Sequence, residues 1–168
     1  LAKKKGSIQR KIDLYASGGT IFEDKSYDTL LEEALNYRDK GFSGWKFRPK
    51  MPLSNKSHSS RIKNPPPFDI KEVINFSSKL RKKVGDDFNL MFDVGCRCKN
   101  VDEAKYLIQG LEDLIFSFVE EPLKRSILNY KKLLKNFKRK LKIGLGEHFY
   151  NFKEFNKWLN SNCFDVVQ

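Results

Sequence analysis

The chain has 168 residues, of which 39% are hydrophobic and 32% charged, and a formal net charge of +12 at pH 7. This length fits one ordinary domain with a buried core, and the composition excludes a disordered or fibrous protein. No apolar run reaches the roughly 18 residues of a membrane-spanning helix, and the start lacks a signal-peptide apolar stretch, so we expect a soluble, cytoplasmic protein without membrane contacts.

Short apolar segments alternate with amphipathic segments, which predicts parallel strands joined by helices. In chain order, we expect a strand at 12–16, a helix at 26–40, a strand at 44–47, a helix at 69–84, a strand at 89–94, a helix at 101–112, a strand at 115–120, a basic helix within 124–142, a strand at 142–144, a helix at 152–159 and a strand at 164–167. Gly41 stands where a helix C-terminal glycine is common, and Asp69 is the expected N-cap of the second helix. Turn residues Ser17, Gly18 and Gly19 follow the first strand.

Six strands and five helices in a strict strand-then-helix order predict an α/β fold with one parallel sheet. The fingerprint G-x-G-x-x-G does not follow the first strand, which disfavours a dinucleotide-binding fold. Eight strands close a TIM-like barrel, and this chain has too few. If the fold is a barrel, we expect only part of it within residues 1–168.

Residues 49–67 interrupt the regular order. They hold five of the six prolines and several serines, without a clear periodicity. A loop of this length is uncommon inside a compact domain and is often functional, for example as a flap over an active site. A disordered segment or a simple surface insertion explains the composition equally well.

Lysine and arginine crowd residues 124–142. A basic helix of this kind can bind the phosphates of a nucleic acid without specificity. The apolar residues between the lysines favour instead the solvated face of an amphipathic helix. We therefore expect no specific nucleic-acid partner.

Cys96 and Cys98 form a C-x-C pair, which raises the question of a zinc site. A second ligand pair at suitable spacing is absent from the sequence, and His58 and His148 are isolated. Reduced structural thiols are the better interpretation.

Three acidic residues end three successive predicted strands. Asp93 closes one strand, Glu120 closes the next, and Glu147 follows the third with its turn, each 27 positions after the one before. An equal step of one strand and one helix puts the three carboxylates at the same level of the C-terminal rim, where barrel active sites lie. For each acid taken singly, a helix N-cap or a surface charge is the favoured interpretation. Three converging carboxylates would repel one another, and a hard divalent cation such as Mg²⁺ relieves that repulsion.

Lys46 and Arg48 stand at the end of the strand that precedes the acids. Period-two alternation places both side chains on one face of that strand. Two cations facing three carboxylates would bind a substrate carboxylate and assist the loss of a nearby proton. The pair alone is weak evidence, since the chain holds 33 basic residues.

Several motifs occur in a fixed order along nearly the whole chain, with 49–67 the least matched part. They are Tyr15-Ala16-Ser17-Gly18, Glu32-Glu33-Ala34, Lys40-Gly41-Phe42, Lys46-x-Arg48, Gly85-Asp86-Asp87, Leu90-Met91-x-Asp93-Val94, Val119-Glu120-Glu121-Pro122, Gly144-x-Gly146-Glu147 and Phe164-Asp165-Val166-Val167-Gln168. This combination resembles the barrel of the mandelate racemase and muconate lactonizing enzyme branch of the enolase superfamily.

The resemblance implies a Mg²⁺-dependent enzyme with a (β/α)₇β barrel. Residues 1–168 would be an incomplete C-terminal barrel domain, without the capping domain and the last strands. Asp93, Glu120 and Glu147 would be the Mg²⁺ ligands, and the shared first step would remove a proton α to a carboxylate. Lys46 takes the position that holds the substrate carboxylate. We expect this segment alone to bind metal without turnover, and the full-length enzyme to be a homo-oligomer.

Two positions depart from the family pattern. The second strand of the family usually carries Lys-x-Lys, whose second lysine transfers the proton, and this chain has Arg48 there. Arginine stays protonated at ordinary pH, so we expect Arg48 to stabilise charge or bind substrate. After Asp93 the family often has Asn, whereas Gly95, Cys96 and Arg97 follow here.

The leading interpretation of function is the dehydration of a sugar acid to a 2-keto-3-deoxy acid. Polar side chains available to contact such a substrate are Tyr15, Ser17, Arg48 and Arg97. Glu147-His148 is similar to some sugar-acid dehydratases, while Arg97 is equally compatible with a surface arginine. Racemisation or cycloisomerisation begins with the same step and stays the alternative. A non-catalytic, basic nucleic-acid-binding protein is the remote one.

Overall fold

The computed structural model describes residues 12–19, 26–48 and 69–168. Its strands form one parallel sheet, in which the spatial order β1-β2-β3-β4-β5-β6 is the order along the chain. None of the helices in these ranges has the length and the apolar composition needed to cross a bilayer. The segment 49–67, with its predicted alternatives of flap, disorder or insertion, lies outside the described residues.

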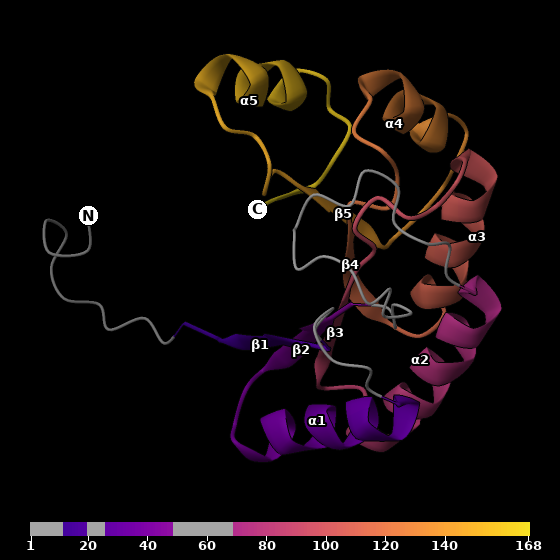
Figure 1. Ribbon diagram of the computed structural model, residues 1–168, viewed down its shortest axis with the longest axis vertical. Helices are drawn as coiled ribbons and strands as arrows, with labels where there is room; N and C mark the ends of the chain where they lie inside the picture. Colours follow the sequence, from indigo (N-terminus) through magenta and orange to yellow (C-terminus); the bar gives the residue numbers. More distant parts are fainter. Residues whose placement is uncertain (1–11, 20–25, 49–68) are drawn as a thin grey trace, which may run out of the picture.

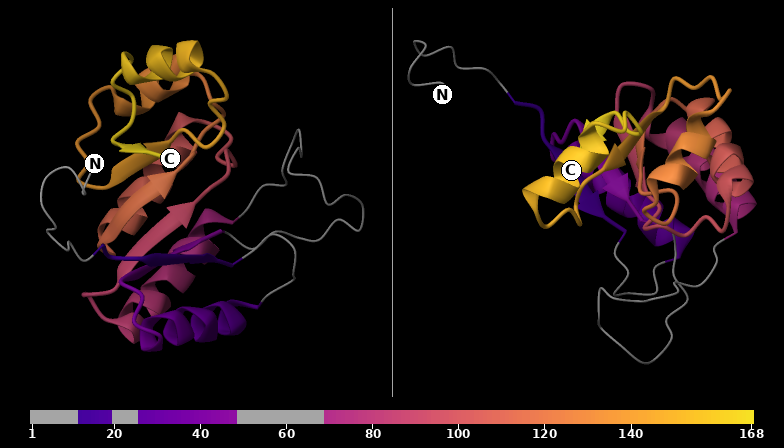
Figure 2. Two further views of the ribbon diagram at one scale, coloured as in Figure 1. Left: turned by 90° about the vertical axis from the view of Figure 1, so that its left-hand side faces the viewer. Right: turned by 90° about the horizontal axis from the view of Figure 1, so that it is seen from above.

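Strands and helices alternate strictly, as the sequence predicts. They are β1 (Tyr15–Gly18), α1 (Tyr27–Asp39), β2 (Gly44–Phe47), α2 (Ile70–Val84), β3 (Asn89–Asp93), α3 (Val101–Glu112), β4 (Phe116–Glu120), α4 (Ile127–Leu134), β5 (Lys142–Leu145), α5 (Phe152–Leu159) and β6 (Val166–Val167). Figure 1 shows α1 to α4 in an arc along one side of the sheet. The left view of Figure 2 looks onto the opposite side, where the strands fan out uncovered by these helices. This confirms the predicted α/β class and the partial barrel.

The alternation of side chains along each strand separates a packed face from an open face. Trp45 and Phe47 are buried, and the ring of Phe47 contacts that of Phe76 on α2, so this face of β2 turns toward the helices. Phe92 on β3 packs against Phe47 with ring centroids 4.9 Å apart. The intervening residue, Lys46, therefore points to the open face, where a site can form.

Helix ends follow the chemistry expected from the sequence. The Asp69 carboxylate accepts hydrogen bonds from two backbone N–H groups in the first turn of α2, which confirms it as the N-cap. After α1, Gly41 has φ +84° and donates its N–H to Arg38 O, while Phe42 donates to Tyr37 O. The rings of Tyr37 and Phe42 meet edge to face. This is the Schellman arrangement, which favours glycine at the left-handed position.

The first strand differs from its prediction at 12–16. It begins at Tyr15 and ends at Gly18, so two of the predicted turn residues belong to the strand. The reason is the length of its partner: β2 has four residues, and its pairing runs from Tyr15 opposite Gly44 to Gly18 opposite Phe47. The apolar residues before Tyr15 are exposed.

The basic helix is also shorter than its predicted range of 124–142. Helix α4 ends at Leu134, because Lys135 is extended and Asn136 has a left-handed φ of +55°. The remaining basic residues belong to the connection to β5. The last strand is limited to Val166–Val167 rather than 164–167, because the Asp165 carboxylate takes the N–H of Ile143 that a longer strand would bond.

Candidate metal centre

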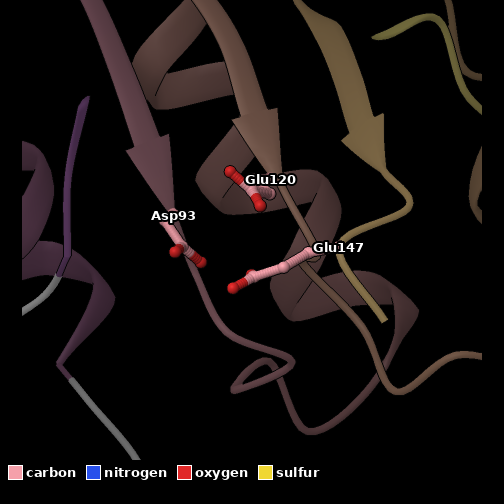
Figure 3. Close-up of side chains that lie close together, drawn as sticks. All are labelled: Asp93, Glu120 and Glu147. Carbon is pink, nitrogen blue, oxygen red and sulfur yellow. The ribbon is translucent and has the colours of Figure 1, made fainter. Parts of the chain in front are cut away.

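Three carboxylates meet at the C-terminal ends of the central strands. Asp93 ends β3, Glu120 ends β4, and Glu147 follows β5, and one oxygen from each lies within 4.8 Å of the others. Figure 3 shows the three side chains pointing toward one another from these elements. Strand register explains the convergence, since Asp93 pairs with Glu120 and Glu120 pairs with Gly144. The equal spacing of 27 residues therefore does place the acids together.

Glu147 reaches the cluster from a turn rather than from the strand itself. Gly146, at φ +137°, lies against the backbone of Gln168, and a Cβ there would come within 2.7 Å of Gln168 O. Glycine is thus required at the position that directs Glu147 back toward the site. The Glu147 side chain is 48% exposed, whereas Asp93 and Glu120 are buried.

Each carboxylate faces a cation from β2 or its end. Lys46 Nζ lies 2.5 Å from Glu120 Oε2, and Arg48 Nε donates to Asp93 Oδ2 at 2.6 Å. Arg48 Nη2 lies 3.9 Å from Glu147 Oε2. Lys46 and Arg48 are two residues apart, and the structure places both on the face that carries the acids, as predicted.

Burial and mutual charge shift the pKa values in this cluster. Burial raises the pKa of Glu120, and the negative charge of Asp93 raises it further, against the opposing effect of Lys46. Burial alone would lower the pKa of Lys46, but its hydrogen bond and ion pair with Glu120 outweigh this and raise it. Burial alone would also lower the pKa of Arg48, but the charge and hydrogen bond of Asp93, together with the charges of Glu147 and Glu120, raise it. Both side chains therefore remain cations at neutral pH.

The carboxylate cluster fits a small divalent cation. Its donors are all oxygen atoms, which is the ligand type that Mg²⁺ prefers, and they converge from three separate strand ends. Asp93 Oδ1 also accepts the N–H of Gly95 at 3.0 Å, which fixes the orientation of that carboxylate. Burial and, next, the charge of Asp93 raise the pKa of Glu120, and a bound cation would favour its charged form against both effects.

Tyr15 and Ser17, predicted to contact substrate, lie on the open face of β1. Ser17 is directly opposite Lys46 in the parallel register, and the exposed residues of β1 alternate with buried ones. Tyr15 is two residues before Ser17 on the same strand, opposite Gly44. These two residues therefore border the cations of the cluster.

Arg97 lies in the loop after β3. It is only 7% exposed, and burial lowers its pKa to about 10. With Lys99, Lys124 and Lys132 it lines a cavity of about 620 Å³ between the loops before α3 and α4. Arg97 is therefore not a surface arginine, which was one of the two interpretations of the sequence.

The cysteines form neither a disulfide nor a metal site in the described part of the chain. All three thiols are free. The acidic cluster is the group of potential ligands found in these ranges, and it includes no cysteine. Burial raises the pKa values of Cys96 and Cys98 to about 12, so both stay protonated, in agreement with structural thiols.

Sequence reasoning assigned no role to Glu121, although the structure buries it beside the site. Its side chain pairs with Arg125, four residues later in the loop before α4, and accepts a hydrogen bond from the Cys96 thiol. The available signal was a second acid directly after Glu120 with a cation four residues on.

Comparison with known proteins identifies relatives of most of the chain. Residues 29–168 match the family model described as Enolase C-terminal domain-like. A D-gluconate/D-galactonate dehydratase of Picrophilus torridus is 27% identical over 168 residues, covering 97% of this chain and 39% of that protein. The chain thus spans about two fifths of the length of this curated relative.

Solved structures share the same fold. An L-talarate dehydratase from Polaromonas sp. JS666, complexed with Mg and L-glucarate, superposes with a TM-score of 0.77 at 21% identity, over 99% of this chain and 41% of that one. A 3,6-anhydro-D-galactonate cycloisomerase from Zobellia galactanivorans gives 0.73 at 26% identity, over 94% and 38%. A racemase from Streptomyces coelicolor A3(2) with bound magnesium gives 0.70 at 21%, over 91% and 37%.

Proposed function

Because the chain belongs to the enolase superfamily, in the family described as Enolase C-terminal domain-like, we propose that it is the barrel part of a Mg²⁺-dependent sugar-acid dehydratase. One observation carries this proposal: three carboxylate oxygens converge within 4.8 Å of one another, opposite two cations. The sugar-acid dehydratases among the relatives support the choice of reaction. The enzyme would remove the proton α to the substrate carboxylate and expel a hydroxyl from the next carbon as water.

Asp93, Glu120 and Glu147 would hold the Mg²⁺ ion. When bound, the ion supplies positive charge that stabilises the negative charge developing on the substrate carboxylate. Lys46 would bind the same carboxylate after exchanging its contact with Glu120, and Arg48 would stabilise the charge from its other side. A proton α to a carboxylate is so weakly acidic that this concentration of charge is needed before a base can remove it.

The cations of β2 are not the base in this proposal. Arg48 stays protonated at ordinary pH, and Lys46 stays beside a carboxylate, first that of Glu120 and then that of the substrate, which favours its charged form. Their contribution is to bind and orient the acid group. The proton acceptor would then be a different residue of the enzyme.

Polar residues beside Lys46 would recognise the hydroxyl groups of the sugar acid. Tyr15 and Ser17 lie on the open face of β1, next to the position proposed for the carboxylate. Arg97, which is buried in the loop after β3, is a proposed third contact.

The metal site is tested by calorimetric titration of the purified protein with Mg²⁺. The Asp93→Ala/Glu120→Ala variant should lose binding, whereas Asp86→Ala/Asp87→Ala, which removes two exposed carboxylates from the turn before β3, should keep it. Equal binding by both variants would refute the site.

The reaction is tested with the full-length enzyme and a panel of sugar acids. A dehydratase should form a 2-keto-3-deoxy acid, detected as its semicarbazone. The alternative reactions are cycloisomerisation and racemisation, and a cycloisomerase and a racemase are among the structures with the same fold. Exchange of the α proton in D₂O without any keto acid would favour that alternative.

A further inference from the structure

We infer that Glu121 is a positioning residue, which holds the neighbouring Glu120 in place between the other two carboxylates of the cluster. Glu121 is not itself one of the three converging acids. The inference rests on the proposed function for the identity of the metal, but its structural basis is independent of any reaction.

The backbone of Glu121 ties together the strands that carry the other two acids. Its N–H donates to Gly144 O on β5 at 3.1 Å. Its carbonyl accepts the N–H of Cys96, in the loop after Asp93, at 2.6 Å. The peptide that follows Glu120 is therefore fixed to both neighbours at the level of the cluster.

The backbone at this junction is in a strained conformation. Glu121 has φ +44° and Cys96 has φ +63°, so both hydrogen-bonded partners adopt the left-handed region without being glycine. Such conformations cost free energy and persist where the surrounding contacts overdetermine them. The side chain of Glu121 supplies those contacts.

Glu121 is 4% exposed, and each oxygen of its carboxylate has a donor. Arg125 Nη1 lies 3.3 Å from Oε1, and the Cys96 thiol donates to Oε2 at 3.3 Å. Burial, with the charge of Glu121, raises the pKa of Cys96 to about 12, so the thiol keeps the proton that it donates. A buried carboxylate without these partners would be strongly destabilising.

The chain offers a matched control for this ion pair. Lys99 and Glu103 also lie four residues apart, with 3.7 Å between Nζ and Oε1. That pair is at the start of α3 and is more exposed, and no contact of Glu103 reaches a strand that ends in one of the three acids among the hydrogen bonds described. Glu103→Gln therefore also removes one negative charge, but it leaves the hydrogen bonds of Glu121 next to Glu120 unchanged.

The deciding experiment compares the Mg²⁺ affinities of wild type, Glu121→Ala, Glu121→Gln and Glu103→Gln by calorimetry. Titrations are run where circular dichroism shows each protein fully folded. We expect Glu121→Ala to lose about 10- to 100-fold in affinity, the range typical when the surroundings that orient metal ligands are disturbed. Glu121→Gln keeps an acceptor for Cys96 and should show an intermediate loss, and Glu103→Gln should bind like wild type.

A lower melting temperature with unchanged affinity in Glu121→Ala would overturn the inference, because it is the result of a merely structural role. If Glu121→Ala does not fold, Glu121→Gln decides in the same way against Glu103→Gln.

If the wild type binds no Mg²⁺, the proposed function is refuted. The role of Glu121 is then tested by a second measurement. The ¹³C carboxyl shift of Glu120 and the ¹⁵Nζ shift of Lys46 report their contact in metal-free protein. Both should move in a folded Glu121 variant and stay in place in Glu103→Gln. Unmoved signals would mean that Glu121 does not position Glu120.

Discussion

Lys46 Nζ lies 2.5 Å from Glu120 Oε2, although 74 positions separate the two residues along the chain. The side chains are 12% and 1% exposed, so water screens this ion pair little. Without Lys46, the buried Glu120 carboxylate would lose its nearest cation while Asp93 continues to repel it. The pair therefore stabilises the buried Glu120 carboxylate in the metal-free protein.

We predict that Lys46→Met lowers the free energy of unfolding by about 3–5 kcal/mol in EDTA, as the loss of one partner of a buried pair does. Mg²⁺ should restore part of this loss, since it would neutralise Glu120. Urea unfolding with EDTA or Mg²⁺ measures both effects. Lys142→Met, at an exposed position of β5, is the control. Losses of equal size in the two variants would contradict the prediction.

A second prediction concerns the turn before Glu147. Gly146→Ala would place a Cβ against Gln168 O, whereas Gly41→Ala, also at positive φ, meets nothing within 4 Å. Gly41→Ala should cost about 1 kcal/mol from the left-handed backbone alone. Gly146→Ala should cost about 1–3 kcal/mol more and weaken Mg²⁺ binding about tenfold, because Glu147 is displaced. Thermal unfolding and calorimetry separate the two, and an unchanged Mg²⁺ affinity in Gly146→Ala would be the contrary result.

The loop after β4 yields a prediction about stability. The buried hydroxyl of Tyr130 donates to Leu123 O at 3.0 Å and accepts the N–H of Leu123. Tyr130→Phe leaves both backbone groups without that partner and should lower stability by about 1–3 kcal/mol. The half-exposed Tyr106 provides the control, since Tyr106→Phe should change stability by less than about 0.5 kcal/mol. Chemical denaturation that gave the same midpoint for both variants would count against this role.

Burial of Cys98 predicts a dependence of stability on alkaline pH. Its pKa rises from 9.0 to about 12 because of burial and, next, the charge of Glu103. Below pH 9 the thiol is protonated in both the folded and the unfolded state, so its contribution is constant. Between pH 9 and 12 the unfolded thiol ionises and the folded one does not, so stability falls as pH rises, by about 1.4 kcal/mol per pH unit.

The test compares unfolding free energies of wild type and Cys98→Ala across this pH range. The variant should show a slope that is smaller by about one proton, whatever its stability at neutral pH. Identical slopes would mean that Cys98 titrates alike in both states.

The ordered strand ends explain why the acidic cluster was predictable from the sequence. Parallel strands joined by helices of similar length bring equivalent positions to one edge, so Asp93 and Glu120 had to be neighbours once β3 and β4 were correct. The sheet face on which the Lys46 and Arg48 side chains lie was likewise predictable, because side chains alternate between the two faces along a strand. The class of fold and most helix bounds rest on these local rules.

Features that depend on distant partners were not predictable in this way. The bounds of β1 are set by the four residues of β2, and those of α4 by the left-handed Asn136. The burial of Arg97 and the hydrogen bonds of Glu121 depend on loops that meet only in the folded chain. A single sequence contains no local signal for such contacts.

The sheet has the same order in space as in the chain, and this has a consequence for synthesis. Each strand leaving the ribosome can pair with the strand made just before it, without waiting for a distant segment. Lys46 and Arg48 on the β2 side are made before Asp93, Glu120 and Glu147. Every carboxylate of the cluster therefore joins a growing sheet in which its countercharge is already present.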